Sequence, residues 1–177
     1  MSKKSSLIVL FFLILIGILG RVFPHIPNVT PVTAIALFAV TYFGFRYSFV
    51  ILLLTMVITD FFIGFYQWQI ILAVYGSFIL AGIVGLFIRR HKTTIVIFSG
   101  TLVASVVFFL VTNFAVWQFG NMYVHSWPGL VECYTMALPF FRNSLIGDLF
   151  YTGAFFGLFE SAQYFILRQA KTVAVKY

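Results

Sequence analysis

TIVIFSGTLVASVVFFLVTNFAVWQ, residues 94–118, is a stretch without a single Asp, Glu, Lys or Arg. A helix needs about 20 consecutive apolar residues to cross the hydrocarbon core of a bilayer, which is ~30 Å thick. Inside that core every backbone N–H and C=O group must be paired within the protein, which leaves helices and closed β-barrels. A barrel strand alternates apolar and polar residues over about ten positions, whereas this run is continuous. Residues 94–118 therefore predict a membrane-spanning helix.

The composition of the whole chain agrees with that prediction. Of the 177 residues, 62% are hydrophobic and only 8% are charged, whereas soluble domains carry about 25% charged residues. So few charges cannot cover the surface of a soluble domain, and we predict an integral membrane protein in contact with the lipid bilayer. The same composition excludes a disordered chain and a nucleic-acid-binding domain, so we expect no nucleic acid as a partner. The single cysteine, Cys133, excludes an internal disulfide.

Six apolar runs are candidate spans, and we expect one all-α domain over residues 1–177, a six-transmembrane-helix bundle. The predicted spans are residues 7–23, 31–44, 47–64, 68–88, 94–118 and 143–167. The second span is short, and a five-span alternative would merge it with the third. The longest connection, residues 119–142, is expected as an outer loop with a short helix before Pro139. The first run lacks a small-residue cleavage site, so we expect a retained helix rather than a signal peptide.

The basic residues indicate how these spans are oriented, because Lys and Arg concentrate in the cytoplasmic connections of membrane proteins. With six spans, all of the eleven Lys and Arg residues except Arg21 and Arg142 fall on one side of the membrane. That side is predicted to be cytoplasmic and to carry both termini. The five-span alternative would place the basic C-terminal tail outside, so the charge distribution argues against it.

Several polar side chains fall within the predicted spans, where such groups usually face the interior of the bundle. Asp60 is either a ligand contact in an outward-facing pocket or the ion-pair partner of Arg21. Asn113 and Trp117 are four residues apart and share one helical face. An amide beside an aromatic plane suits a flat polar ligand. The alternative is an interhelical hydrogen bond from Asn113 and an interfacial position for Trp117.

The start of the last predicted span carries a second group of candidate residues, Arg142, Asn143 and Asp148. Asp148 lies in the first helical turns, where the helix dipole favours an anion. It is either a site residue or the ion-pair partner of Arg142. Asn143 is a candidate helix cap as well as a candidate ligand contact.

Small residues recur on two of the predicted spans. Gly17 and Gly20 lie on the first, and Ala81 and Gly85 form a small-xxx-small pair on the fourth. Such residues let helix backbones approach each other closely. We expect ordinary packing within the bundle, and docking to another membrane subunit is the alternative.

Three stretches resemble a family of small bacterial membrane proteins described at most as transport proteins. They are RVFPHIPNVTPVTAIALFA at residues 21–39, TDFFIGFY at residues 59–66 and ALPFFRNSLIGD at residues 137–148. In size and number of spans, that family is similar to the substrate-binding S subunits of energy-coupling-factor vitamin importers. Likeness of fold alone does not determine function, so the function that the resemblance implies is an expectation.

The resemblance implies a pocket at the outer face of a bacterial inner-membrane protein that binds a small vitamin-like nutrient. The proline-rich loop 24–31 would be its lid. A separate transmembrane coupling subunit and cytoplasmic ATPases would energise uptake. The residues implied to line the pocket are Asn28, Asp60, Asn113, Trp117, Arg142, Asn143 and Asp148. We expect no catalytic residues, no cofactor and no resident metal.

Two other functions remain open from the sequence. A structural or assembly protein of the membrane would use the same polar residues as contacts between helices. A membrane enzyme acting on a lipid-linked substrate would use Asp60, Glu132, Asp148 and His125 for acid–base chemistry, and at least two of them would have to converge. The chain contains no Gly-rich phosphate loop, so ATP hydrolysis would have to come from a partner.

Overall fold

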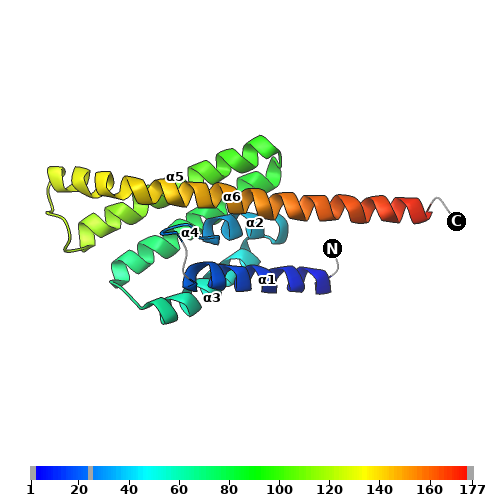
Figure 1. Cartoon of the computed structure of the whole chain (residues 1–177), viewed down its shortest axis with the longest axis horizontal. Coiled ribbons are helices and arrows are strands. Elements are labelled where there is room, and N and C mark those ends of the chain that lie inside the picture. The colour runs from blue at the N-terminus through cyan, green and yellow to red at the C-terminus, as the bar shows by residue number, and fades with distance from the viewer. Residues whose placement is uncertain (1–2, 24–25, 175–177) are drawn as a thin grey trace.

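The computed structural model describes residues 3–23 and 26–174, and every regular element in them is an α-helix (Figure 1). All-α architecture is thus confirmed. Four helices, α1, α3, α4 and α5, are long and apolar enough to cross a membrane, as expected for a membrane protein. The helices are α1 (Lys3–Val22), α2 (Val32–Phe43), α3 (Phe45–Ile63), α4 (Trp68–Arg90), α5 (Thr94–Phe119) and α6 (Trp127–Ala174).

The short second helix is the centre of the bundle. Ten of the 12 residues of α2 are buried, and α2 contacts each of the other five helices. Ala34, Ala36 and Ala39, all fully buried, keep its surface narrow enough for several helices to approach. At ~1.5 Å per residue the helix is about 18 Å long, shorter than the ~30 Å hydrocarbon core. The run expected as the second span is therefore a short helix buried at the centre of the bundle.

A single residue, Gly44, separates α2 from α3. Its φ of 93° lies in the left-handed region that glycine adopts readily, and its N–H group donates to the carbonyl groups of Ala39 and Val40. This turn ends α2 and lets α3 pack beside it. The single merged helix of the five-span alternative is not formed, because the backbone turns at this glycine and α2 and α3 are separate helices.

The last helix differs from the expectation. Residues 119–142 were expected as an outer loop, but α6 begins at Trp127 and runs for 48 residues through Pro139. Proline removes one backbone donor and disfavours a helix interior by about 3 kcal/mol. Packing on α5 outweighs this cost: the Tyr134 hydroxyl donates to the Leu110 carbonyl at 2.7 Å, and the rings of Phe109 and Phe141 stack 4.6 Å apart.

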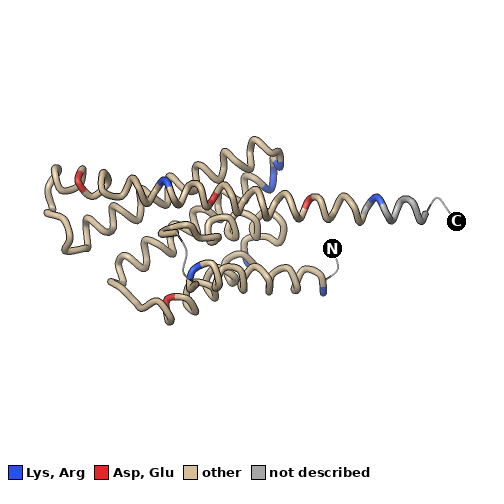
Figure 2. The backbone as a smooth tube through the Cα atoms, in the orientation of Figure 1, with Lys and Arg blue, Asp and Glu red and all other residues tan. Residues whose placement is uncertain are grey.

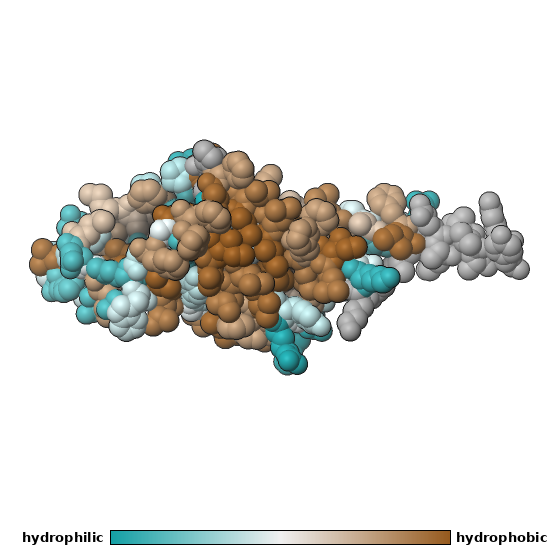
Figure 3. Space-filling view, turned by 90° about the horizontal axis from the view of Figure 1, so that it is seen from below, coloured by the Kyte–Doolittle hydropathy of each residue, from teal (hydrophilic) through white to brown (hydrophobic). Residues whose placement is uncertain are grey.

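Charges and apolar surface are distributed as in a membrane bundle. Most Lys and Arg residues lie toward the end of the bundle where α1 begins and α6 ends (Figure 2), and α4 ends there with Arg89 and Arg90. At the same end Lys92 and Glu160 form an ion pair of 2.9 Å. Figure 3 shows a broad hydrophobic band over the middle of the molecule. This band has the apolar character that contact with lipid requires.

Candidate functional site

A cavity of about 180 Å³ lies between α2, α4, α5, α6 and the segment 26–31 that precedes α2. Five aromatic rings line it: Phe78, Phe108, Phe109, Phe140 and Phe141. The polar side chains on its wall are Asn28, Thr30, Thr33, Ser105, Thr112, Asn113, Ser144 and Asp148. The mixture of flat rings with a few convergent polar groups is typical of small-molecule sites.

Helical periodicity places most of these side chains. On α5, Ser105 and Thr112 are two turns apart and face the cavity, and on α6 the cavity residues Phe141, Ser144 and Asp148 recur at intervals of three and four. Ser105 and Thr112 were not predicted as site residues from the sequence. The signal that would have found them is the polar spacing of seven residues along an otherwise apolar span.

Asp148 is the only acidic residue on the cavity wall among the described residues. Its side chain is 4% exposed. The Ser105 hydroxyl donates to its Oδ2 atom at 2.6 Å, and Thr33 also interacts with the carboxyl group. The expected ion pair with Arg142 is wrong: Arg142 is exposed, and no described side chain forms an ion pair with Asp148.

The segment 26–31 closes one side of the cavity. Asn28 adopts a left-handed φ of 65°, which asparagine tolerates better than most residues, and its side chain lines the cavity. The Asn143 side chain donates to the Pro27 carbonyl at 3.2 Å. A Cβ on Gly147 would lie 3.2 Å from the Cα of Val29, so glycine permits this close approach to α6. Two residues of the expected lid, 24 and 25, lie outside the described residues.

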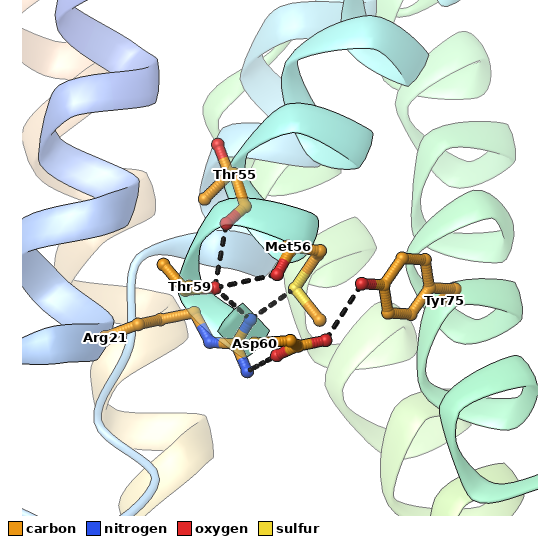
Figure 4. A network of polar contacts seen from close by, with 6 residues as sticks. All are labelled: Arg21, Thr55, Met56, Thr59, Asp60 and Tyr75. Carbon is orange, nitrogen blue, oxygen red and sulfur yellow. Dashed lines mark hydrogen bonds and ion pairs between the residues drawn. The ribbon is translucent and has the colours of Figure 1, made fainter. Parts of the chain in front are cut away.

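Asp60 belongs to a separate network that joins α1, α3 and α4 (Figure 4). Its Oδ1 atom lies 3.0 Å from the Arg21 guanidinium, and its Oδ2 atom accepts a 2.8 Å hydrogen bond from the Tyr75 hydroxyl. Arg21 also donates to the Thr59 hydroxyl at 2.6 Å. The expected ion pair with Arg21 is confirmed. Asp60 does not line the cavity, because α3 turns it toward α1.

Trp117 and Arg142 are also outside the cavity wall. The Trp117 indole N–H donates to the Val124 carbonyl at 3.1 Å, so it holds the connection between α5 and α6. Of the seven expected site residues, the structure brings Asn28, Asn113 and Asp148 together on the wall and places Asn143 at the closing segment. Asp60, Trp117 and Arg142 lie elsewhere.

The acidic residues considered for an enzyme are dispersed. Asp60 and Asp148 lie in different networks. No three His, Cys, Asp or Glu side chains among the described residues are grouped as a metal site. The Cys133 thiol is buried and donates to the Asn113 carbonyl at 3.4 Å, so in the described structure it acts as a packed side chain.

Residues 1–171 match DUF6580, a family of unknown function. The chain belongs to this family. No curated protein and no solved structure matches it. Membership in DUF6580 covers nearly the whole chain but prescribes no activity, so a function has to be inferred from the cavity.

Proposed function

We propose that this DUF6580 protein is the substrate-binding membrane subunit of an importer for a small vitamin-like nutrient. The proposal rests on the cavity of about 180 Å³, in which five Phe rings and a buried carboxylate converge inside the helical bundle. Polar and ionisable groups at membrane depth are costly and usually serve a site or a pathway. The rings would stack on a flat ligand, and Asn28 and Asn113 would bind its polar edge.

The proposal includes a topology and partners. All six helices would cross a bacterial inner membrane, and both termini would lie in the cytoplasm. The concentration of Lys and Arg where α1 begins and α6 ends supports that orientation (Figure 2). The segment 26–31 would act as the lid on the opposite side. Energy for release would come from a transmembrane coupling subunit and cytoplasmic ATPases, because the sequence has no phosphate-binding loop.

A ligand screen tests the binding function. We expect one compound from a panel of water-soluble vitamins, their precursors and nucleobases to raise the melting temperature of the detergent-purified protein in a dose-dependent manner. At 100 times its dissociation constant a ligand stabilises a protein by about 2.7 kcal/mol, which corresponds to several degrees for a chain of this size. No shift with any compound would favour a structural or assembly protein, in which each interhelical polar contact contributes ~0.6 kcal/mol.

Substitutions at two residues of α5 test whether the ligand binds in the cavity. Asn113→Ala is expected to weaken binding about tenfold, because a hydrogen-bonding group on the cavity wall is lost. Trp117→Ala is the matched control, since Trp117 lies one turn further along α5 and outside the cavity. Isothermal titration with the compound found in the screen measures both. Equal loss in the two variants would place the ligand at the end of α5 rather than in the cavity.

A further inference from the structure

The two aspartates of the chain are both buried, and they have contrasting surroundings. Asp60, 1% exposed, is neutralised by Arg21 and receives a hydrogen bond from Tyr75. Asp148, 4% exposed, receives a hydrogen bond from Ser105 and has no cationic partner among the described side chains. A buried carboxylate without a counter-charge is strongly unfavourable. The described part of the bundle thus provides a counter-charge at Asp60 and none at Asp148.

Among the residues that the structure describes, no neighbouring element supplies the missing charge. The groups that face Asp148 are Thr33 from α2 and Ser105 from α5, and both are neutral hydroxyls. The N-terminus of α2 contributes at most about half a positive charge. The N-cap residue of α2 is Pro31, which makes no side-chain capping bond. The remaining space in front of Asp148 is the cavity itself.

The rest of the cavity wall suits a positive charge. Aromatic faces attract cations through their quadrupole, most strongly where water is excluded. Five Phe rings share the wall with Asp148, among them Phe108 and Phe141. The volume of about 180 Å³ is below the ~300–1,000 Å³ of drug-sized sites. Carboxylate, rings and size together favour a small ligand with one positively charged nitrogen.

We propose that the cavity binds a small organic cation, a flat ring bearing one positively charged nitrogen, with Asp148 as its counter-ion and the Phe rings as its walls. This inference rests on the proposed binding function and names the ligand class of the same site. Asn28 and Asn113 then select the polar substituents of the ring, and the segment 26–31 covers the bound cation.

The first test needs no ligand and compares the two aspartates. Asp148→Asn keeps the size of the side chain and removes an ionisable group that has no counter-charge among the described residues, so the ligand-free variant is expected to melt at or above the wild-type temperature. Asp60→Asn is the matched control, and it is expected to melt several degrees lower because Arg21 loses its partner. A fall in melting temperature for Asp148→Asn equal to that of Asp60→Asn, or failure to fold, would show that the charge of Asp148 serves the fold, and would overturn the proposal.

The second test measures how the wild-type protein responds to ligands that share one ring shape but differ in charge. The probes are nicotinamide, its N1-methyl cation and nicotinate, together with cationic, neutral and anionic members of other single-ring series, at millimolar concentration. We expect cations to raise the melting temperature most within each series, and Asp148→Asn to weaken their binding about tenfold or more.

The outcomes separate this inference from the binding function on which it rests. If neutral or anionic members produce the largest shifts, the cavity binds small molecules but the cation class is wrong. If a cation binds and Asp148→Asn leaves its affinity unchanged, Asp148 is not the counter-ion and the inference falls. If no compound of any charge shifts the melting temperature, both proposals fail.

Discussion

Asp60→Ala is expected to lower the free energy of unfolding by about 3–5 kcal/mol. The change leaves the Arg21 guanidinium, whose side chain is only 15% exposed, without its carboxylate, and removal of one partner from a buried pair typically costs this much. Tyr75 also loses the acceptor of its hydroxyl group. Reversible unfolding in a mild detergent, followed by far-UV circular dichroism, measures the loss.

The double variant Arg21→Met, Asp60→Leu is the control for this prediction. Replacing both members of a buried pair with apolar residues is often nearly neutral, so we expect it to recover most of the lost stability. A cost below about 1 kcal/mol for Asp60→Ala would contradict a stabilising network. Because Asp60 does not line the cavity, the folded fraction of Asp60→Ala is expected to bind ligand with unchanged affinity.

The second large effect is expected where α1 packs on the bundle. Among the described helices α1 contacts only α2 and α3. A Cβ on Gly17 would lie 2.7 Å from Cγ2 of Thr55, and a Cβ on Gly20 would lie 2.6 Å from Cδ of Pro31. Overpacking costs about 1–3 kcal/mol per site, more than the ~1 kcal/mol by which alanine favours a helix over glycine. Gly17→Ala combined with Gly20→Ala is therefore expected to loosen α1 and lower stability.

Gly76 and Gly157 provide the matched control for the α1 variant. Both are helical, and a Cβ added at either meets no atom within 4 Å. Replacing both with alanine is expected to raise stability by about 0.4–1 kcal/mol per site, because the unfolded chain loses freedom. The two double variants should therefore shift the melting temperature in opposite directions. A stabilised Gly17, Gly20 variant would show that α1 is not held by close packing of these glycines against Thr55 and Pro31.

The membrane-spanning helices could be predicted because their signal is local. The expected spans 7–23, 47–64, 68–88 and 94–118 differ from α1, α3, α4 and α5 by a few residues at their ends. Each such helix pairs its own backbone groups, so its limits follow from hydropathy and from glycines or basic residues at its ends. The start of α6 was predicted wrongly because proline disfavours a helix interior. In the structure, contacts with residues of α5 that are distant in the sequence outweigh this local preference.

The site could be predicted only in part for a related reason. A helix that is apolar on all sides carries little information about which side faces its neighbours, so Asp60 and Asp148 were equivalent candidates in the sequence. Contacts between distant residues separate them: Asp148 meets Ser105, 43 positions away, whereas Asp60 meets Arg21, 39 positions away. Asn113 and Trp117 share a helical face, but the cavity ends between them.

Composition and hydropathy were enough to predict an all-α membrane protein and the positions of α1, α3, α4 and α5, and the places of Asp60 and Arg21 in the predicted spans indicated their pairing. Composition and hydropathy are sums over single residues. A long apolar run must form a helix in the bilayer, because its backbone groups have to be paired within the protein. Tertiary packing was needed to show that α2 is the buried centre, that α6 passes through Pro139, and that Asp148 rather than Asp60 faces the aromatic cavity. These features depend on how helices rotate against one another, and that rotation is determined by packing between residues remote in sequence.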